Sequence, residues 1–371
     1  MQVAVEPVDA PSMVGGQIKL VRRALAGVAV ASVAMAGLSG CDRVETVGEV
    51  RNPTVAIGRD GAASAVLGGK VFWAFGDTFT ANGGVRNSGA YASIADPTKV
   101  TDTLTRGVPA QLVPFDAAES AQNGAGDGQW VIWPASVIAT SDARALVLST
   151  KFHASDAGWV NGSLVVSEVS AGSTTSTRLG EPLRAPQATY ANSPYADGGN
   201  IYLHDCGGIA APPELLDRLQ PGSVLSTVVN LTDPSTRCRV ARVPAGEVLD
   251  PAAYRYWNGL GWGTDPSQAV PAVPGSNSGI SVAWVPAWKR YAALSNPGFS
   301  KDIYLSTSPR PEGPWTTPRK VFTAPANIYA VRIHPHLSSP DLSTMAITYF
   351  RTDTASTPGG VVLAKLTPTA P

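Results

Sequence analysis

After residue 41 the sequence is a succession of short apolar or alternating runs, separated by Gly, Pro, Asn and Asp. The 371 residues include 37 Gly and 31 Pro, and no amphipathic segment of helical length interrupts the pattern. Residues 213–219 are expected to form one short helical turn at most. Short runs bounded by turn residues are typical of β-strands, so the sequence predicts an all-β protein.

The runs also repeat in pairs. Each pair has a first strand with small residues, a turn, and then a more apolar strand. Five pairs are predicted, at 60–67 with 71–75, 130–139 with 145–150, 188–195 with 200–204, 279–285 with 290–294, and 331–337 with 344–349. Third strands fit at 163–170, 302–307 and 361–366, and an insertion near 207–236 makes the spacing uneven.

Repeated small sheets around an axis describe a β-propeller, and five blades fit this length. A radial arrangement also protects the many strand edges that such a chain creates. A double-sheet sandwich is the alternative. We therefore expect a five-bladed β-propeller that occupies residues 53–371.

The N-terminal segment has the features of an export signal. Lys19, Arg22 and Arg23 precede a small-residue apolar run at 24–38, which ends in Leu-Ser-Gly followed by Cys41. This order resembles a bacterial lipobox, in which Cys41 is lipidated and becomes the first residue of the mature chain. An ordinary signal peptide with a chance cysteine is the alternative. We expect a lipoprotein signal peptide at 1–40, a lipidated spacer at 41–52, and anchoring to the outer face of the cytoplasmic membrane.

Charge and cysteine content restrict the partners and the compartment. Lys+Arg and Asp+Glu are 28 each, so no basic excess favours nucleic-acid binding. Export makes a disulfide between Cys206 and Cys238 a reasonable expectation, with two buried free thiols as the alternative.

Several chemistries lack their motifs. The four histidines form no HExxH pattern and the cysteines form no CxxC pattern, so a dedicated metal site is not expected. No glycine-rich loop precedes a helix, and no GxSxG nucleophile elbow is present. No cofactor is therefore predicted.

Two aspartates carry the strongest chemical signal. Asp60 opens the first predicted strand in Gly-Arg-Asp-Gly, and Asp77 follows the second in Phe-Gly-Asp-Thr-Phe. If these strands are antiparallel neighbours, the 17-residue separation brings both acids to the same end of the first blade. Two carboxyl groups facing one cleft are what glycoside hydrolysis requires. Turn residues that hydrogen-bond their own backbone are the alternative for both.

Other residues are predicted substrate contacts from their positions near strand ends. Trp133 is a predicted sugar platform, although most tryptophans are expected in the core. The polar candidates are Asn87, Ser88, Asp127, His153, His204, Asn277, Ser278 and His334.

The sequence also resembles an actinobacterial family that was long known only as a domain of unknown function. The segments that carry the resemblance include Gly-Arg-Asp-Gly at 58–61, Val-Phe-Trp-Ala-Phe-Gly-Asp-Thr-Phe at 71–79, Val-Ile-Trp-Pro at 131–134, Tyr-Arg-Tyr-Trp-Asn-Gly at 254–259, Glu-Gly-Pro-Trp at 312–315, His-Pro-His-Leu at 334–337 and Ile-Thr-Tyr at 347–349. The similarity extends over roughly residues 54–366. Tyr-Phe-Arg at 349–351 and His-Asp-Cys at 204–206 depart from the expected pattern.

That family is associated with endo-D-arabinanase activity. The resemblance implies a five-bladed propeller that cleaves the D-arabinan of mycobacterial arabinogalactan or lipoarabinomannan, with Asp60 and Asp77 as the catalytic acids. Which aspartate is the acid and which is the base or nucleophile stays open at this point. A non-catalytic glycan-binding propeller and an envelope-assembly scaffold are the alternatives, because propellers serve all three purposes.

Overall fold

The computed structural model describes residues 42–371 apart from 56, 126–127, 156–157, 208–235 and 353–358. The chain divides into two units, Met1–Ser39 and Gly40–Pro371, and the description concerns the second. Regular structure in the described part is mostly β, as the sequence predicted.

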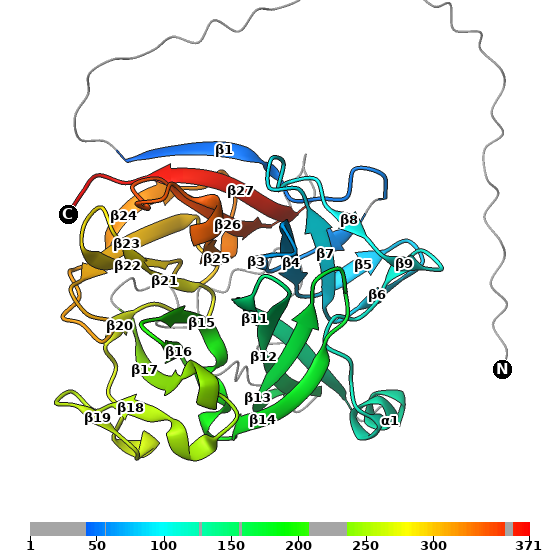
Figure 1. Cartoon of the computed structure of the whole chain (residues 1–371), viewed down its shortest axis with the longest axis horizontal. Helices are drawn as coiled ribbons and strands as arrows, with labels where there is room; N and C mark the ends of the chain where they lie inside the picture. Colours follow the sequence, from blue (N-terminus) through cyan, green and yellow to red (C-terminus); the bar gives the residue numbers. More distant parts are fainter. Residues whose placement is uncertain (1–41, 56, 126–127, 156–157, 208–235, 353–358) are drawn as a thin grey trace, which may run out of the picture. The chain divides into compact units, whose positions relative to one another are not determined.

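Most strands belong to sheets of four or more strands, each antiparallel and built largely from consecutive strands (Figure 1). The first contains β3 (Ala63–Leu67), β4 (Lys70–Phe75), β7 (Ser88–Ala92) and β8 (Thr101–Asp102). The second contains β11 (Gln129–Ser141), β12 (Arg144–Ser155), β13 (Gly158–Ser170) and β14 (Thr177–Arg184). The third contains β15 (Asn192–Asp197), β16 (Asn200–Asp205), β17 (Arg237–Pro244), β18 (Arg255–Trp257) and β19 (Trp262–Gly263), with β20 (Val273–Pro274) paired to β17.

The fourth sheet contains β21 (Ile280–Val285), β22 (Arg290–Ser295), β23 (Asp302–Ser308) and β24 (Arg319–Thr323). The fifth contains β25 (Ile328–Ile333), β26 (Met345–Arg351), β27 (Gly360–Thr367) and β1 (Arg43–Glu49). Two small sheets join β2 (Gly58–Arg59), β5 (Thr78–Thr80) and β6 (Gly83–Val85), and β9 (Leu104–Thr105) with β10 (Val108–Pro109).

Local sequence explains the hairpins. Strand β4 is apolar and almost wholly buried, and it pairs with β3 so that Ala63 faces Ala74 and Leu67 faces Lys70. Gly68 and Gly69 connect them with φ of 59° and 71°, a backbone that glycine adopts without a steric penalty. Two-residue connections with positive φ match the twist of antiparallel strands. Glycine therefore sets the register of this hairpin.

The sheets follow one another around a common centre (Figure 1). Their first strands touch in succession: β3 contacts β11, β11 contacts β15, β15 contacts β21, and β21 contacts β25. Ser64 on β3 bonds His334, which directly follows β25. The first strands thus form a ring, and the hydrophobic clusters occupy the spaces between neighbouring sheets, including the space between the fifth and the first.

One predicted region needs correction. The segment expected to be a spacer at 41–52 contains β1, which pairs along β27 from Arg43–Thr367 to Glu49–Val362. Asp42 extends the attachment, because it accepts hydrogen bonds from Arg319 and Thr369. The first described strand therefore completes the last sheet.

A few helical segments escaped prediction. Helix α1 (Ala117–Ala125) follows the first sheet, and 3₁₀ turns occupy Gln187–Ala191, Ala245–Glu247, Pro251–Ala253, Pro266–Gln268 and Pro335–Leu337. The predicted strands at 188–195 and 331–337 are correspondingly shorter. The helical turn expected at 213–219 lies outside the described residues.

Cys206 and Cys238 form a disulfide bond between the end of β16 and the start of β17. None of the helices in the described ranges is long and apolar enough to cross a membrane.

Candidate active site

Asp60 and Asp77 lie opposite each other where the first hairpin ends. Strand β2 pairs with β5, so that Gly58 faces Phe79 and Arg59 faces Thr78. The next pair in this register is Asp60 and Asp77, and the Asp60 amide donates to the Asp77 carbonyl at 3.2 Å. Directly opposed antiparallel residues have Cβ atoms about 4.5–5.5 Å apart. The two carboxyl groups therefore share one end of the first sheet.

Glycines on either side make room for this pair. Gly61 has a φ of 55°, and the Gly76 amide donates to the Asp60 carbonyl at 2.8 Å. A Cβ atom at Gly76 would lie 2.5 Å from Asp60 Oδ1. Glycine is thus required at position 76, because the Asp60 carboxyl packs directly on the backbone of that residue.

Asp60 is the more buried acid. Its Oδ2 accepts a hydrogen bond from the Tyr329 hydroxyl at 2.7 Å, and Tyr329 lies on β25 at the far end of the sequence. Burial raises the pKa of Asp60 to about 6, and the charge of Asp77 adds to the increase, while the Tyr329 hydrogen bond opposes it. Asp60 can therefore hold a proton in mildly acidic solution.

The pKa of Asp77 is raised on balance, although two donors oppose the rise. Burial raises its pKa, but the Trp133 indole and the Arg86 guanidinium both oppose that shift. Trp133 Nε1 donates to Asp77 Oδ1 at 3.2 Å, and Arg86 Nη1 lies 3.6 Å from the same oxygen. A carboxylate held by two donors beside a second, more buried carboxyl fits the division into base and acid.

Aromatic rings surround the pair. Tyr329 packs against Phe299 with ring centres 5.2 Å apart and against Phe350 at 4.8 Å. Phe299 keeps 41% of its surface exposed. Trp133 packs edge-on against Phe152 at 4.6 Å. Exposed or half-buried rings beside two acids provide surfaces on which a sugar ring can stack.

Two predicted substrate contacts are corrected by burial. Asn87 is fully buried, and its side chain bonds the backbone of Ile132 and Val113 through both its amide and its carbonyl. Ser88 is fully buried and its hydroxyl bonds Thr78. Both residues therefore stabilise the loops beneath Asp77 and are closed to a ligand, because their polar atoms are already used.

Two histidines and one serine are also corrected. His334 is 2% exposed, and its ring nitrogens bond Ser64 at 2.6 Å and Thr348 at 2.8 Å. His204 is fully buried between β15 and the core. Ser278, predicted together with Asn277, is buried and donates to the Asn296 carbonyl. The sequence placed these residues correctly near the ends of strands. It did not predict that their side chains point into the protein interior.

His153 and Asn277 remain partly exposed. His153 contacts Gln122 and Trp130, and among the contacts of the described residues none joins it to Asp60 or Asp77. Asp127 and Cys41 lie outside the described residues. Trp133 alone among the predicted supporting residues contacts an aspartate.

Tyr329 and Arg86 were missed by sequence reasoning. Tyr329 is separated from Asp60 by 269 residues, and the ring of first strands brings them together. Arg86 directly precedes Asn87 and Ser88, which the sequence analysis predicted as substrate contacts. The position of Arg86 was therefore available from the sequence, whereas that of Tyr329 was not.

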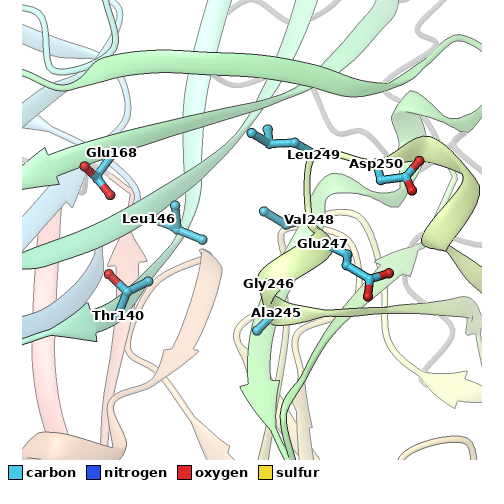
Figure 2. A pocket seen from close by; sticks show the side chains of 9 residues that line it. All are labelled: Thr140, Leu146, Glu168, Ala245, Gly246, Glu247, Val248, Leu249 and Asp250. Carbon is cyan, nitrogen blue, oxygen red and sulfur yellow. The ribbon is translucent and has the colours of Figure 1, made fainter.

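A separate surface cavity of ≈ 590 Å³ lies between the second and third sheets (Figure 2). It is lined by Thr140, Leu146, Glu168 and the segment 245–250. Glu168 is paired with Arg144, and neither Asp60 nor Asp77 reaches this cavity. We assign the site by the paired acids and not by this cavity. Within the described ranges, no group of three or more His, Cys, Asp or Glu residues is arranged to hold a metal ion.

Comparison with known families gives a partial match. Residues 225–352 match the family described as "Domain of unknown function (DUF4185)". No curated protein sequence matches the chain. The match contains β17 to β26, which is the whole fourth sheet and parts of the third and fifth, and it leaves the segment with Asp60 and Asp77 outside.

Solved structures show a related fold. A Bacteroides ovatus protein with a suggested hydrolase activity has 15% identity and a TM-score of 0.56, covering 89% of this chain and 93% of its own. The GH43_1 enzyme from Xanthomonas citri in complex with xylotriose has 15% identity and a TM-score of 0.53, covering 86% and 90%. A family 117 glycoside hydrolase from Zobellia galactanivorans has 10% identity and a TM-score of 0.50, covering 89% and 91%. At these identities the likeness establishes a propeller-like fold.

Proposed function

We propose that the larger sheets are the blades of a five-bladed β-propeller, with the ring of first strands around its axis. The placement of each hydrophobic cluster between two consecutive sheets supports this arrangement, because radial packing of blades buries exactly those faces. The cluster of Trp73 and Phe75 with Ala346 and Leu363 supports closure between the last sheet and the first.

We further propose that the chain is a glycoside hydrolase. The observation that carries this proposal is the pair Asp60 and Asp77, which lie opposite each other in different surroundings: burial raises the pKa of Asp60 to about 6, whereas an indole and a guanidinium oppose the rise at Asp77. Glycosidases of this kind divide the work between a carboxylic acid and a carboxylate. The similar structures from Xanthomonas citri and Zobellia galactanivorans are glycoside hydrolases, which is consistent with the same proposal.

In the proposed reaction Asp60 is the general acid. Its proton passes to the glycosidic oxygen as the bond between that oxygen and the anomeric carbon breaks. Positive charge develops on the sugar ring, and the Asp77 carboxylate either attacks the anomeric carbon or removes a proton from the attacking water. Arg86 and Trp133 hold Asp77 in place and stabilise its ionised form.

For the substrate we propose D-arabinan of the mycobacterial cell wall, cleaved within the chain. The resemblance of segments 58–61 and 71–79 to endo-D-arabinanases supports this choice. The half-buried rings near Asp60 suit a neutral furanose polymer that offers hydroxyl groups and apolar faces but no charge.

The glycan-binding alternative predicted that one aspartate would turn away into its own loop. Contacts of both carboxyl groups with side chains of other sheets argue against that arrangement, since Tyr329 bonds Asp60 and Trp133 bonds Asp77.

For the location we propose export and lipid anchoring at Cys41. The disulfide between Cys206 and Cys238 supports an oxidising compartment.

Incubation of the purified protein with mycobacterial arabinogalactan tests the substrate. We expect a ladder of arabino-oligosaccharides of intermediate length, and none from xylan or from L-arabinan. Binding to arabinogalactan without release of fragments would support the lectin-like alternative. Release from xylan alone would keep the hydrolase and refute the D-arabinan assignment.

A further inference from the structure

The side chain of Arg332 bridges three sheets at the centre of the ring. Arg332 lies on β25, and its Nη1 donates to the Ser193 hydroxyl on β15 at 3.0 Å and to the Ile280 carbonyl on β21 at 2.9 Å. The Val331 carbonyl lies 3.4 Å from the same atom. Because β15, β21 and β25 are the first strands of their sheets, the guanidinium joins the first strands of three sheets.

Arg332 lacks a counter-charge. All three acceptors of its hydrogen bonds are neutral, and none of the described Asp and Glu side chains forms an ion pair with it or affects its titration. Burial alone lowers the pKa of Arg332 to about 10, so the group is still charged near neutral pH. Charges inside proteins are normally paired, because an isolated buried ion costs several kcal/mol or more.

Unused donors remain on this cation. The protein bonds all involve Nη1, which leaves Nε and Nη2 without an acceptor among the described residues. These two nitrogens are not buried without a partner, because part of the Arg332 side chain stays accessible to solvent. A small species at the centre can therefore reach two parallel N–H donors.

Among the described residues, no negatively charged group affects Arg332. Ser193 has a φ of 43°, an uncommon conformation for a residue with a side chain, in the irregular part of β15 that presents its hydroxyl to Arg332. Burial lowers the pKa of His204 to about 4 and that of His334 well below its usual range, and the charge of Arg332 lowers both further. Both imidazoles are therefore neutral.

We propose that Arg332, with Ser193, binds a small monovalent inorganic anion such as chloride at the centre of the ring. One anion would balance the one guanidinium, and the contacts from three sheets favour a small ion over a large one. The ion would stabilise the folded chain, because it binds a site that exists only when the third, fourth and fifth sheets are assembled. This site is independent of the proposed hydrolase activity.

Thermal unfolding of the purified protein tests the proposal when sodium chloride is replaced stepwise by sodium gluconate at constant ionic strength. We expect the unfolding midpoint to rise by about 2–4 °C as chloride saturates the site. Bromide should replace chloride in this effect, and chlorine NMR should show line broadening that bromide reverses. Identical unfolding curves in chloride and gluconate, with no line broadening, would overturn the proposal.

Variants locate the effect. Arg332→Gln should unfold at the same temperature in both salts, whereas Arg51→Gln, which changes an exposed arginine, should keep the full chloride dependence. If Arg332→Gln fails to fold, anomalous scattering from bromide in crystals of the unmodified protein decides the location. Bromide at Arg332 supports the site, and bromide only at surface arginines contradicts it.

Discussion

At the scale of single residues, the candidate site depends on two carboxyl groups with different surroundings. Asp60 accepts one hydroxyl hydrogen bond inside the protein, whereas Asp77 meets an indole and a guanidinium near solvent. Burial raises the pKa of both, but Asp60 is the more buried of the two, and a guanidinium opposes the rise only at Asp77. The account therefore assigns the proton to Asp60 and the charge to Asp77.

Tyr329→Phe tests that assignment through the pH profile. The lost hydroxyl stabilises ionised Asp60, so its removal should raise the pKa of Asp60 above about 6. If Asp60 must be protonated, the alkaline limb of kcat/KM should move upward by about one pH unit. Tyr304→Phe, at a tyrosine on β23 without such a bond, should leave the profile unchanged. A shift of the acidic limb instead would make Asp60 the base.

At the scale of elements, the short strand β2 fixes Asp60. Arg59 directly precedes Asp60 and is buried. Its Cζ atom lies 4.4 Å from the centre of the Phe75 ring, and its Nη2 lies 2.9 Å from Oδ1 of the buried Asp102 carboxylate on β8. Asn52 donates to the same carboxylate at 2.9 Å. The edge strand of the first sheet thus anchors the segment that carries the proposed acid.

Asp102→Ala should destabilise the protein and impair the site together. Removing one partner leaves the Arg59 charge buried and unpaired, which typically costs about 3–5 kcal/mol. Chemical denaturation measures the loss, and the activity of the folded fraction should also fall because Arg59 adjoins Asp60. Asp96→Ala, which removes an exposed ion pair with Lys99, is the control and should change little. Equal stability of the two variants would refute the anchoring role.

Sequence patterns predicted the elements better than their ends. The apolar run at 71–75 and its pairing with 60–67 predicted the first hairpin and the approach of Asp60 to Asp77, and the structure adds the register. Burial could not be predicted in the same way. Asn87, Ser88 and His334 have polar side chains at strand ends, but each has a partner in another sheet. The role of β1 was missed because its partner strand is the last one in the chain.

At the scale of the whole molecule, contacts between distant parts of the sequence hold the sheets in order. The first described strand pairs with the last, and the Asp42–Arg319 ion pair reinforces that junction. Within the third sheet, the Cys206–Cys238 disulfide joins β16 to β17 across the insertion. The strand pairing and the ion pair act only in the folded chain, whereas the disulfide also restricts the unfolded chain.

Replacing both cysteines with alanine should lower the free energy of unfolding by about 2–4 kcal/mol, because a cross-link that closes a loop of this length restricts the unfolded chain. Chemical denaturation with and without reductant measures the free energy of unfolding. Reductant should lower this free energy for the unmodified protein and leave that of the double variant unchanged. Unchanged stability in both comparisons would show that the third sheet does not depend on the bond. Activity should survive, since neither cysteine touches the aspartate pair.

The most direct test of the central claim compares Asp60→Asn and Asp77→Asn in the arabinogalactan assay, with Asp96→Asn as a matched control. We expect both site variants to unfold at nearly the temperature of the unmodified protein while their initial rates fall by about a thousandfold or more. The control should retain full activity. Substantial activity in both folded site variants would contradict the assignment of Asp60 and Asp77 as the catalytic pair.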